Sequence, residues 1–281
     1  MEIDSQHDKV VAITGASSGI GRVTALELAR AGARVLLLNR SRERTQPVLD
    51  AIAAEVGEGR AEMVPLDLGS LDSVREAART LLARDEPLHV LINNAGLAGQ
   101  RGETKDGFEL AFGTNHLGHF LLTQLLLERL KQSAPARVVT VASRAHLRVK
   151  GIDFDAVRGR TRSVSGYPEY SVSKLANVLF SAELGRRMAG TGVRSYSLHP
   201  GVVASDIWRR IPGFARPLVK LFMISNEEGA RTSLYCATAP ELADQTSHYY
   251  DECKEQKPSR AARDEALARE LWERSEGWTQ G

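Results

Sequence analysis

Short, wholly apolar runs alternate along the chain with longer segments in which apolar residues recur every three or four positions. The first run spans residues 10–14 and reads Val-Val-Ala-Ile-Thr, which is typical of a strand buried on both faces. The next segment, 19–31, places Val23, Leu26 and Ala29 on one side of a helix. The pattern therefore predicts a strand followed by an amphipathic helix.

The same alternation continues along the rest of the chain. Further strands are expected at 34–39, 62–66, 88–93, 137–142, 193–198 and 247–250. Helices are expected at 41–56, 70–86, 106–130, 168–189, 227–236 and 259–275, with Ser41 and Ser70 opening two of them. This order indicates an α/β, doubly wound (Rossmann) fold with helices on both faces of a parallel sheet. Because no repeat or linker interrupts the pattern, residues 1–281 are expected to form a single domain.

Composition narrows the class of protein. The chain has 281 residues, of which 42% are hydrophobic and 26% charged, and these values exclude a disordered or collagen-like chain. The 37 basic and 35 acidic residues leave a net charge of +2, so nothing in the charge favours a nucleic-acid partner. The histidines do not stand with Cys236 and Cys253 at zinc-ligand spacings, and no metal is expected.

Location can also be predicted from the sequence. Two cysteines in a chain of this length fit a reduced, intracellular enzyme. Residues 1–9 are polar and carry no signal-peptide pattern. No apolar run approaches the roughly 20 residues that cross a bilayer. We therefore expect a soluble, cytoplasmic protein without a transmembrane segment.

A glycine-rich turn follows the first strand and has the spacing Gly-x-x-x-Gly-x-Gly. Gly15 permits a tight turn, Gly19 permits close approach of a pyrophosphate, and Gly21 permits close packing of helix on sheet. The free N–H groups of the helix start then favour phosphate. An ordinary strand-to-helix turn is the alternative. The expected nucleotide contacts in this turn are Gly15, Ser17, Ser18, Gly19, Ile20 and Gly21.

The end of the second strand predicts which nucleotide binds. An acidic residue there would bind a ribose 2′-hydroxyl, whereas this chain has Asn39 followed by Arg40. A guanidinium pairs well with a 2′-phosphate. We therefore expect NADP(H) as the cofactor, the alternative being that Arg40 is an exposed surface charge.

Tyr170 and Lys174 stand four positions apart on a predicted helix, so both project from one face. An ammonium beside a phenol favours the phenolate and lowers the pKa of the tyrosine. Such a phenol can exchange a proton with a carbonyl or alcohol oxygen. Taken alone, the pair also fits an ordinary amphipathic helix.

Together these motifs resemble the short-chain dehydrogenases/reductases. The resemblance covers about residues 9–251 and rests on Thr14–Gly21, Asn93-Asn94-Ala95-Gly96, Tyr170-x-x-x-Lys174 and Pro200-Gly201, in that order. It implies a seven-stranded parallel sheet in the order 3-2-1-4-5-6-7. It also implies hydride transfer between a nicotinamide and a carbonyl or alcohol.

The resemblance also implies residue roles. Tyr170 corresponds to the acid/base, Lys174 to the residue that holds the ribose, Ser143 to the serine that binds the substrate oxygen, and Asn115 to the asparagine of the proton relay. Further cofactor contacts implied are Asp67, Leu68, Asn94, Ala95, Gly96, Pro200, Gly201, Val203 and Ser205. Ser143 could instead cap a turn, and Asn94 could bind strand-end backbone groups. Tyr167 is a weaker rival of Tyr170.

Several features are similar to the retinol dehydrogenase-like branch of that family. They are the separation of 27 positions from Ser143 to Tyr170, the sequences at 115–120 and 173–177, and the sequence from Ala261 to Trp272. The last of these lies in an extra helical C-terminal segment expected at about 252–281. The resemblance implies NADP(H) and an apolar aldehyde, ketone or alcohol, either retinal-like, lipid or xenobiotic. The segment at about 202–225 corresponds to a substrate lid. Its mix of basic and apolar residues could also contact a membrane surface.

Two alternative functions also fit the sequence. The chain could be a catalytically silent nucleotide sensor, or a protein that binds lipid surfaces through the segment at 202–225. Members of the family often form homo-oligomers, in which the helices at 106–130 and 168–189 would pair.

Overall fold

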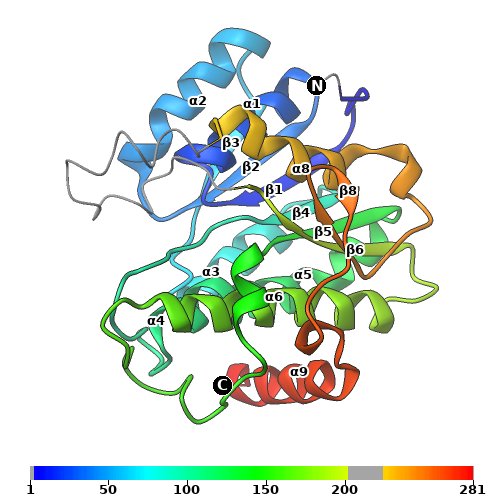
Figure 1. The fold of residues 1–281 in the computed structure, drawn as a ribbon. Coiled ribbons are helices and arrows are strands. Elements are labelled where there is room, and N and C mark those ends of the chain that lie inside the picture. Colours follow the sequence, from blue (N-terminus) through cyan, green and yellow to red (C-terminus); the bar gives the residue numbers. More distant parts are fainter. Residues whose placement is uncertain (1–2, 202–223, 281) are drawn as a thin grey trace.

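An open sheet of eight strands organises the computed structural model, which describes residues 3–201 and 224–280 (Figure 1). The strand order is β3-β2-β1-β4-β5-β6-β7-β8. The strands are β1 Val10–Thr14, β2 Arg34–Asn39, β3 Ala61–Pro65, β4 Val90–Asn93, β5 Ala136–Val141, β6 Val193–His199, β7 His248–Asp251 and β8 Lys254–Glu255. The pairings from β3 through to β7 are all parallel, which confirms the expected doubly wound order.

β8 is an addition to the seven expected strands. It pairs antiparallel with β7, with Tyr250 opposite Glu255 and Asp251 opposite Lys254. The two residues between them, Glu252 and Cys253, have φ values of 52° and 58°, as a two-residue hairpin turn of type I′ requires. Neither is the Gly or Asn that usually announces such a turn, so the sequence pattern does not reveal it.

Helices cover both faces of the sheet. Figure 1 shows α1 (Gly19–Arg30), α2 (Arg42–Val56) and α8 (Asn226–Thr238) on one side. The other side carries α3 (Leu71–Leu82), α5 (Gly118–Gln132) and α6 (Tyr167–Arg187). The apolar strands divide between the two layers because successive side chains point to opposite faces. In β1, Ala12 belongs to the cluster under α5 and α6, whereas Val11 and Ile13 belong to the cluster under α1.

The helix starts expected at Ser41 and Ser70 are present. The Oγ of Ser41 accepts a hydrogen bond from the N–H of Arg44 (3.3 Å), and that of Ser70 accepts one from the N–H of Ser73 (3.4 Å).

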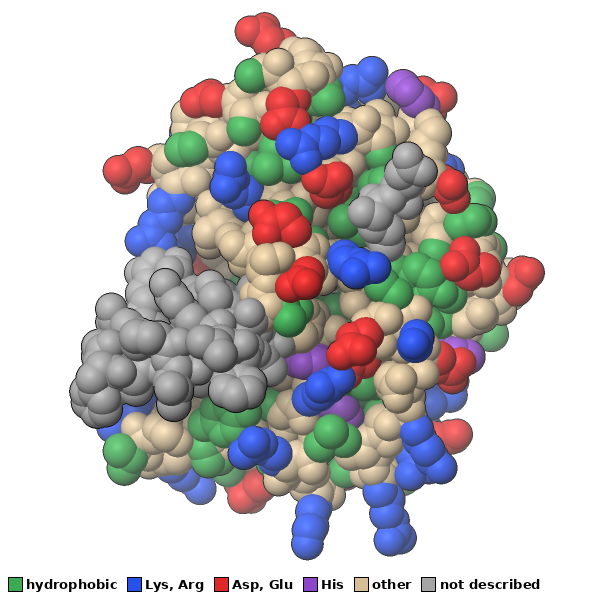
Figure 2. Space-filling view, turned by 45° about the horizontal axis from the view of Figure 1, so that its top comes forward, with side chains coloured by type: hydrophobic (Ala, Val, Ile, Leu, Met, Phe, Trp, Pro, Cys, Tyr) green, Lys and Arg blue, Asp and Glu red, His purple; other side chains and the backbone are tan. Residues whose placement is uncertain are grey.

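Charged side chains of both signs are interspersed on the face that Figure 2 shows.

The helix expected at 106–130 is interrupted and starts later. It consists of α4 (Leu110–Phe112), a π-helical turn η1 (Gly113–Leu117) and α5. Asp106 does not open this helix, because its carboxylate accepts a hydrogen bond from the N–H of Leu71 (2.9 Å) at the start of α3. The expectation of a helix start there was wrong since only the tertiary fold brings α3 close.

The C-terminal helix is also shorter at its start than expected. After a 3-10 turn, η5 (Ala261–Arg263), α9 runs over Glu265–Thr279. Asp264 caps α9 by accepting from the N–H groups of Ala266 (3.0 Å) and Leu267 (3.1 Å). In Figure 1, α9 lies beyond α6, on the side away from the sheet.

Aromatic packing fixes α9 on α6. The ring of Trp272 stacks on Phe180 at a centroid distance of 5.9 Å and meets Phe120 edge-on at 5.1 Å. The guanidinium of Arg187 lies 4.5 Å from the Trp272 centroid. One face of α6, a helix that was expected to pair between subunits, therefore carries α9 of the same chain.

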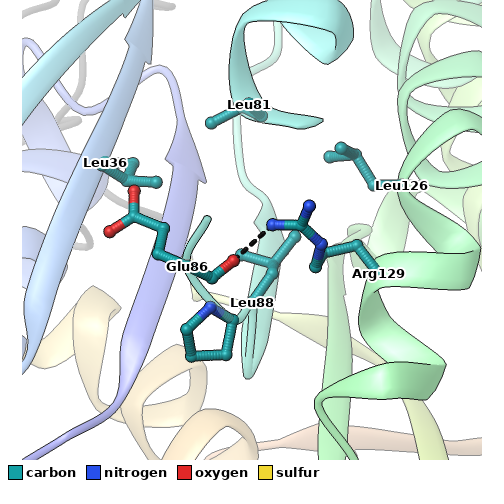
Figure 3. Close-up of a pocket in the computed structure, with 7 residues that line it drawn as sticks. Leu36, Leu81, Glu86, Leu88, Leu126 and Arg129 are labelled. Atoms are coloured by element: carbon teal, nitrogen blue, oxygen red, sulfur yellow. Dashed lines mark hydrogen bonds between the residues drawn. The ribbon is translucent and has the colours of Figure 1, made fainter. Parts of the chain in front are cut away.

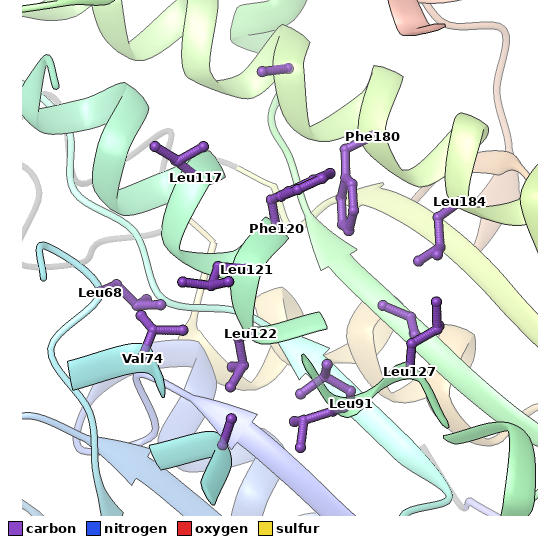
Figure 4. Packing of buried hydrophobic residues seen from close by; sticks show 14 of the residues in the cluster. Leu68, Val74, Leu91, Leu117, Phe120, Leu121, Leu122, Leu127, Phe180 and Leu184 are labelled. Atoms are coloured by element: carbon purple, nitrogen blue, oxygen red, sulfur yellow. The ribbon is translucent and has the colours of Figure 1, made fainter. Parts of the chain in front are cut away.

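A small hollow and the main core lie on the same side of the sheet. The hollow is lined mostly by leucines of β2, α3 and α5, and Arg129 closes it by donating to the carbonyl of Glu86 (Figure 3). Figure 4 shows the core itself, where Leu91 of β4, Leu122 and Leu127 of α5 and Leu184 of α6 converge. This packing fixes the position of α5 and α6 against the sheet, and their N-terminal ends lie at the carboxyl edge of the strands.

None of the helices in the described part of the chain is long and apolar enough to cross a membrane. Of the expected lid at 202–225, residues 202–223 lie outside the described residues.

Candidate active site

A cleft of about 570 Å³ opens at the carboxyl edge of the sheet, beside the point where the strand order reverses between β1 and β4. Ligands of doubly wound folds bind at such a point. Most of the residues that the sequence singled out line it. They are Gly15, Ser17, Ser18, Gly19, Ile20, Gly21, Arg40, Asp67, Leu68, Asn94, Ala95, Gly96, Tyr170, Lys174 and Pro200.

The first turn requires glycine because of its backbone conformation and its close packing. Gly15 and Gly19 have φ values of 70° and 56°, which side chains rarely tolerate. A Cβ on Gly15 would lie 2.8 Å from Cα of Ala95, and a Cβ on Gly21 would lie 2.4 Å from the carbonyl oxygen of Gly15. The turn is therefore packed tightly against the loop after β4.

The start of α1 keeps its N–H groups free of a side-chain cap. Ser18 is the N-cap and makes no side-chain hydrogen bond to the helix. By contrast, Ser41, Ser70 and Ser225 each cap their own helices. The N–H groups and positive dipole end of α1 are thus available to an anionic group in the cleft.

Two asparagines hold the glycine turn from the side. Oδ1 of Asn39 accepts from the N–H of Ala16 (2.7 Å), and Nδ2 of Asn94 donates to the carbonyl of Thr14 (2.8 Å). Asn94 therefore binds strand-end backbone groups, as its alternative interpretation proposed, while also lining the cleft. The holding role of Asn39 was missed, because it depends on a contact between two distant turns.

Two arginines stand where β2 ends. Arg40 and Arg44 are both exposed and both line the cleft. Within residues 3–201 and 224–280, neither guanidinium has an ion-pair partner. Arg44 was missed because its place in the first turn of α2 marks it as an ordinary helix residue. Nearby, a carboxylate oxygen of Asp67 accepts from the N–H of Gly69 (3.1 Å).

Tyr170 and Lys174 face the cleft from α6. The Nζ of Lys174 lies 5.7 Å from the centroid of the Tyr170 ring and donates to the carbonyl of Val141 (2.8 Å). Lys174 is only 4% exposed. A Cβ on Gly96 would lie 3.4 Å from this Nζ, so the loop after β4 passes directly beside the ammonium.

The pKa values of the pair differ from the expected direction in one respect. Burial lowers the pKa of Lys174 to about 7. Burial also raises the pKa of Tyr170, although a side-chain hydrogen bond with Ser143 acts in the opposite direction. The lowered tyrosine pKa expected from the spacing of the pair was wrong, because burial raises it.

Asn115 lies in the π turn and supports the cleft from behind. Its Oδ1 accepts from the N–H of Leu97 (2.9 Å), and its Nδ2 donates to the carbonyl of Leu97 (3.0 Å) and to Oγ of Ser173 (2.9 Å). Asn115 is fully buried and does not line the cleft. Its Oδ1 would lie 3.5 Å from a Cβ on Gly96, close to the position of Lys174.

Ser143 lies between the end of β5 and the 3-10 turn η2 (Arg144–Arg148), and its backbone is extended. Its Oγ accepts from the N–H of Ala145 (3.1 Å) at the start of η2, so the turn-capping alternative describes one of its contacts. The same side chain lies close enough to Tyr170 to act on its phenol, where it opposes the rise in pKa. The ring of Tyr167 packs 5.7 Å from that of Tyr170 and under the guanidinium of Arg148 at 5.4 Å.

The remaining residues are placed as follows. Gly201 is described but does not line the cleft, and Val203 and Ser205 lie outside the described residues. Lining residues that the sequence did not single out include Leu97, Gln100, Thr114 and Asn226. Leu97 and Gln100 lie in the loop after β4, Thr114 lies in the π turn and Asn226 begins α8, so no common sequence motif joins them. The part of the chain that the structure describes contains no group of three or more His, Cys, Asp or Glu residues that could hold a metal.

Comparison with known proteins agrees with this geometry. The short chain dehydrogenase family model matches residues 9–213. Retinol dehydrogenase 12 of Mus musculus is 46% identical over 267 residues, covering 94% of this chain and 84% of that protein. Retinol dehydrogenase 13 of Homo sapiens is 43% identical over 276 residues, covering 95% and 83%.

Solved structures give the same result. A crystal structure of a protein from Mycobacterium Paratuberculosis superposes with a TM-score of 0.80 at 36% identity, covering 99% of this chain and 96% of that one. The Pseudomonas aeruginosa RhlG/NADP active-site complex superposes with a TM-score of 0.71 at 26% identity, covering 88% and 95%. The chain is an oxidoreductase of the hydride-transfer type, and it belongs to the short-chain dehydrogenase family, in its retinol dehydrogenase-like branch.

Proposed function

We propose that the protein is an NADP(H)-dependent carbonyl reductase whose substrate is an apolar aldehyde or ketone. The observation that carries the proposal is that the uncapped start of α1 and the side chains of Tyr170 and Lys174 line one continuous cleft. A phosphate-binding turn and a proton-transfer pair are both required for nicotinamide-dependent reduction.

The cleft fits a dinucleotide with a 2′-phosphate. The turn from Gly15 to Gly21 offers free N–H groups for the pyrophosphate. At the end of β2, Arg40 and Arg44 offer two guanidinium groups to an additional phosphate. Asn39 has no carboxylate that would repel it. The solved structure that names NADP in its active site supports the same choice by similarity.

When bound, the nucleotide supplies the hydride. The side chains of this chain supply the proton and the polarisation. The phenol of Tyr170 donates its proton to the substrate oxygen, and the Oγ–H of Ser143 donates a hydrogen bond to the same oxygen. Lys174 lies 5.7 Å from the phenol ring and, together with Asn115, replaces the proton from solvent.

The electrostatics suit Tyr170 as the proton donor of a reduction. Reduction requires a protonated phenol, and burial raises the pKa of Tyr170, which keeps the proton on the ring at neutral pH. Oxidation of an alcohol requires the phenolate, which the same burial disfavours.

The substrate class is proposed from two supports. Relatives at 46% and 43% identity carry the name retinol dehydrogenase. The sequence at 202–225 contains nine large apolar residues, which suit an apolar ligand. They are Ile207, Trp208, Ile211, Phe214, Leu218, Leu221, Phe222, Met223 and Ile224.

The test is NADPH oxidation with nonanal, benzaldehyde and all-trans-retinal. We expect turnover of at least one aldehyde, and we expect Tyr170→Phe to abolish it while NADPH binding, followed by fluorescence, is kept. Full activity in Tyr170→Phe would contradict the assignment. NADPH binding without turnover of any aldehyde would favour the rival function, a nucleotide sensor on the same fold.

Two further parts of the proposal concern location and assembly. We place the protein in the cytoplasm, with peripheral membrane contact tested by vesicle sedimentation. A homo-oligomer would have to use a surface other than the face of α6 that Trp272 covers, and light scattering of the purified protein measures its mass directly.

A further inference from the structure

A buried histidine lies directly behind the serine of the proposed site. The Nδ1 of His146 is 2.7 Å from the carbonyl oxygen of Ser143, and the backbone N–H of His146 donates to the same oxygen at 3.1 Å. His146 is fully buried. Two donors from one residue therefore fix the peptide group of Ser143.

The opposite edge of this imidazole binds the C-terminal segment. The backbone N–H of Ser259 donates to Nε2 of His146 at 3.2 Å. A carbonyl oxygen can only accept, so Nδ1 carries the ring proton and Nε2 is left as the acceptor that Ser259 needs. The neutral Nδ1–H tautomer satisfies both contacts, and burial keeps it neutral by lowering the pKa of His146.

Other contacts hold the same turn against the C-terminal strands. The rings of His146 and Tyr249 meet edge to face at 5.0 Å. Next to it in η2, the guanidinium of Arg144 pairs with the carboxylate of Asp251 at 2.5 Å. The turn that follows Ser143 is thus fixed by β7 and by the chain beyond it.

The C-terminal segment also reaches the π turn. The Oγ of Ser275 in α9 lies 3.1 Å from Nε2 of the buried His116, which is the neighbour of Asn115. The family model ends at residue 213, so both contacts come from a part of the chain beyond the shared match. One segment, 252–280, therefore touches the supports of Ser143 and of Asn115.

We propose that His146 is a positioning residue for Ser143, and that the C-terminal segment 252–280 serves the reaction by holding His146 through the N–H of Ser259. The inference rests on the proposed function, because it assigns a purpose to the position of the Ser143 hydroxyl. Catalysis is sensitive to such positions, since a displacement of about 1 Å can cost about 100-fold in rate.

The expected effect is confined to the carbonyl half of the reaction. Neither Ser143 nor His146 lines the cleft beside the glycine turn. Loss of the His146 contacts should therefore lower kcat/KM for the aldehyde and leave the affinity for NADPH unchanged.

Substitutions at 146 separate the two edges of the ring. His146→Phe keeps the ring shape and the packing on Tyr249 but loses both hydrogen bonds, and we expect kcat/KM for nonanal to fall about 10- to 100-fold. His146→Asn keeps an N–H near the Nδ1 position and should recover part of that loss. Kd for NADPH should stay within twofold in both variants.

Substitutions at 259 test the C-terminal contact without touching the turn. Ser259→Pro removes the N–H that His146 accepts, so it should reproduce the loss seen in His146→Phe. Ser259→Ala keeps that N–H and removes only the Oγ contact with the N–H of Ala262 (3.1 Å), and it should retain wild-type kcat/KM.

The full-length wild type gives a measurement that needs no variant and no activity. ¹⁵N NMR of His146 should show the neutral Nδ1–H tautomer, and the amide of Ser259 should be protected from hydrogen exchange. A rapidly exchanging Ser259 amide or the other tautomer would overturn the inference, even if the enzyme is active.

The kinetic outcomes separate this inference from the proposed function. If the wild type reduces no aldehyde, the proposed function fails while the NMR result still judges the His146 contacts. If the wild type is active and folded His146→Phe keeps kcat/KM within twofold, the positioning role is wrong. An equal loss in NADPH affinity and in kcat/KM would show a general structural role and would also overturn it.

Discussion

His119 lies between Asn115 and Thr14 and is hydrogen-bonded to both. Its Nδ1 is 2.9 Å from the carbonyl oxygen of Asn115, and its Nε2 is 2.8 Å from Oγ1 of Thr14. The same Oγ1 accepts from the N–H groups of Asn94 (3.0 Å) and Ala95 (2.9 Å). Burial lowers the pKa of His119 to about 4, so a neutral ring joins the π turn to the strand that enters the glycine turn.

This link predicts energetic coupling between two residues 105 positions apart. His119→Phe and Thr14→Val should each destabilise the protein, because each leaves the other polar group buried without its partner. A double-mutant cycle by urea denaturation should give a coupling of about 0.5–3 kcal/mol. The control is Thr80→Val on α3, whose hydroxyl bonds the carbonyl of Glu76 within its own helix. Additive effects at 119 and 14 would contradict the link.

Lys174 predicts a rise in stability with pH in the nucleotide-free protein. Its folded pKa of about 7 lies below the 10.5 of the free side chain, so between these values the unfolded chain binds one proton more than the folded chain. The free energy of unfolding should therefore rise from pH 7 to pH 10, by at most about 1.4 kcal/mol per pH unit. Below pH 7 Lys174 is charged in the folded protein as well, so burial of this charge lowers the free energy of unfolding by its full amount.

The measurement compares wild type with Lys174→Met by urea denaturation at pH 7, 8, 9 and 10. The difference between the two proteins should change with pH in this window, because the variant lacks the buried titrating group. Parallel stability curves would show that Lys174 titrates at its ordinary pKa.

Arg40 and Arg44 predict discrimination between the two nicotinamide nucleotides. Arg40→Ser and Arg44→Ser should each weaken NADPH binding about 10- to 100-fold, since a charged hydrogen bond contributes about 1.5–3 kcal/mol. NADH binding should not change. Arg42→Ser is the matched control, because Arg42 is exposed in the same turn of α2 and does not line the cleft. Calorimetric titration gives both affinities, and equal losses for NADH would rule out a phosphate contact.

Gly21 predicts an intolerance to side chains that Gly277 of α9 does not share. Its substituted Cβ would lie 2.4 Å from the carbonyl oxygen of Gly15 and 2.5 Å from Nδ2 of Asn94. Gly21→Ala should therefore lose nucleotide binding and about 1–3 kcal/mol of stability. Gly277→Ala in α9 is the control, because a Cβ there meets nothing within 4 Å. Wild-type NADPH affinity in Gly21→Ala would be inconsistent with the packed turn.

Trp272 predicts how strongly α9 is held on α6. Trp272→Ala removes the contacts with Phe120, Phe180 and Arg187. The free energy of unfolding should fall by about 3–5 kcal/mol. Glu273→Ala, an exposed neighbour on α9, should change it by less than about 0.5 kcal/mol. If Trp272→Ala is as mild as the control in urea denaturation, α9 does not contribute to the folded core.

The features that sequence alone determined are local in the chain. The glycines between residues 15 and 21 follow a strand and open a helix, and Tyr170 and Lys174 share a helix face because they are four positions apart. Alternating apolar runs were enough for the layers of the fold. Each of these features depends on residues within about one helical turn or one strand, so it can be predicted without knowing the rest of the fold.

Tertiary structure alone decided the electrostatics and the supports of the site. The pKa of Tyr170 rises because surrounding segments exclude water, which no i,i+4 spacing reveals. Asp106 caps α3 and does not open its own helix, and Ser259 binds His146 across 113 positions of sequence. Desolvation and long-range hydrogen bonds depend on which distant segments meet, and the chain acquires those neighbours only when it folds.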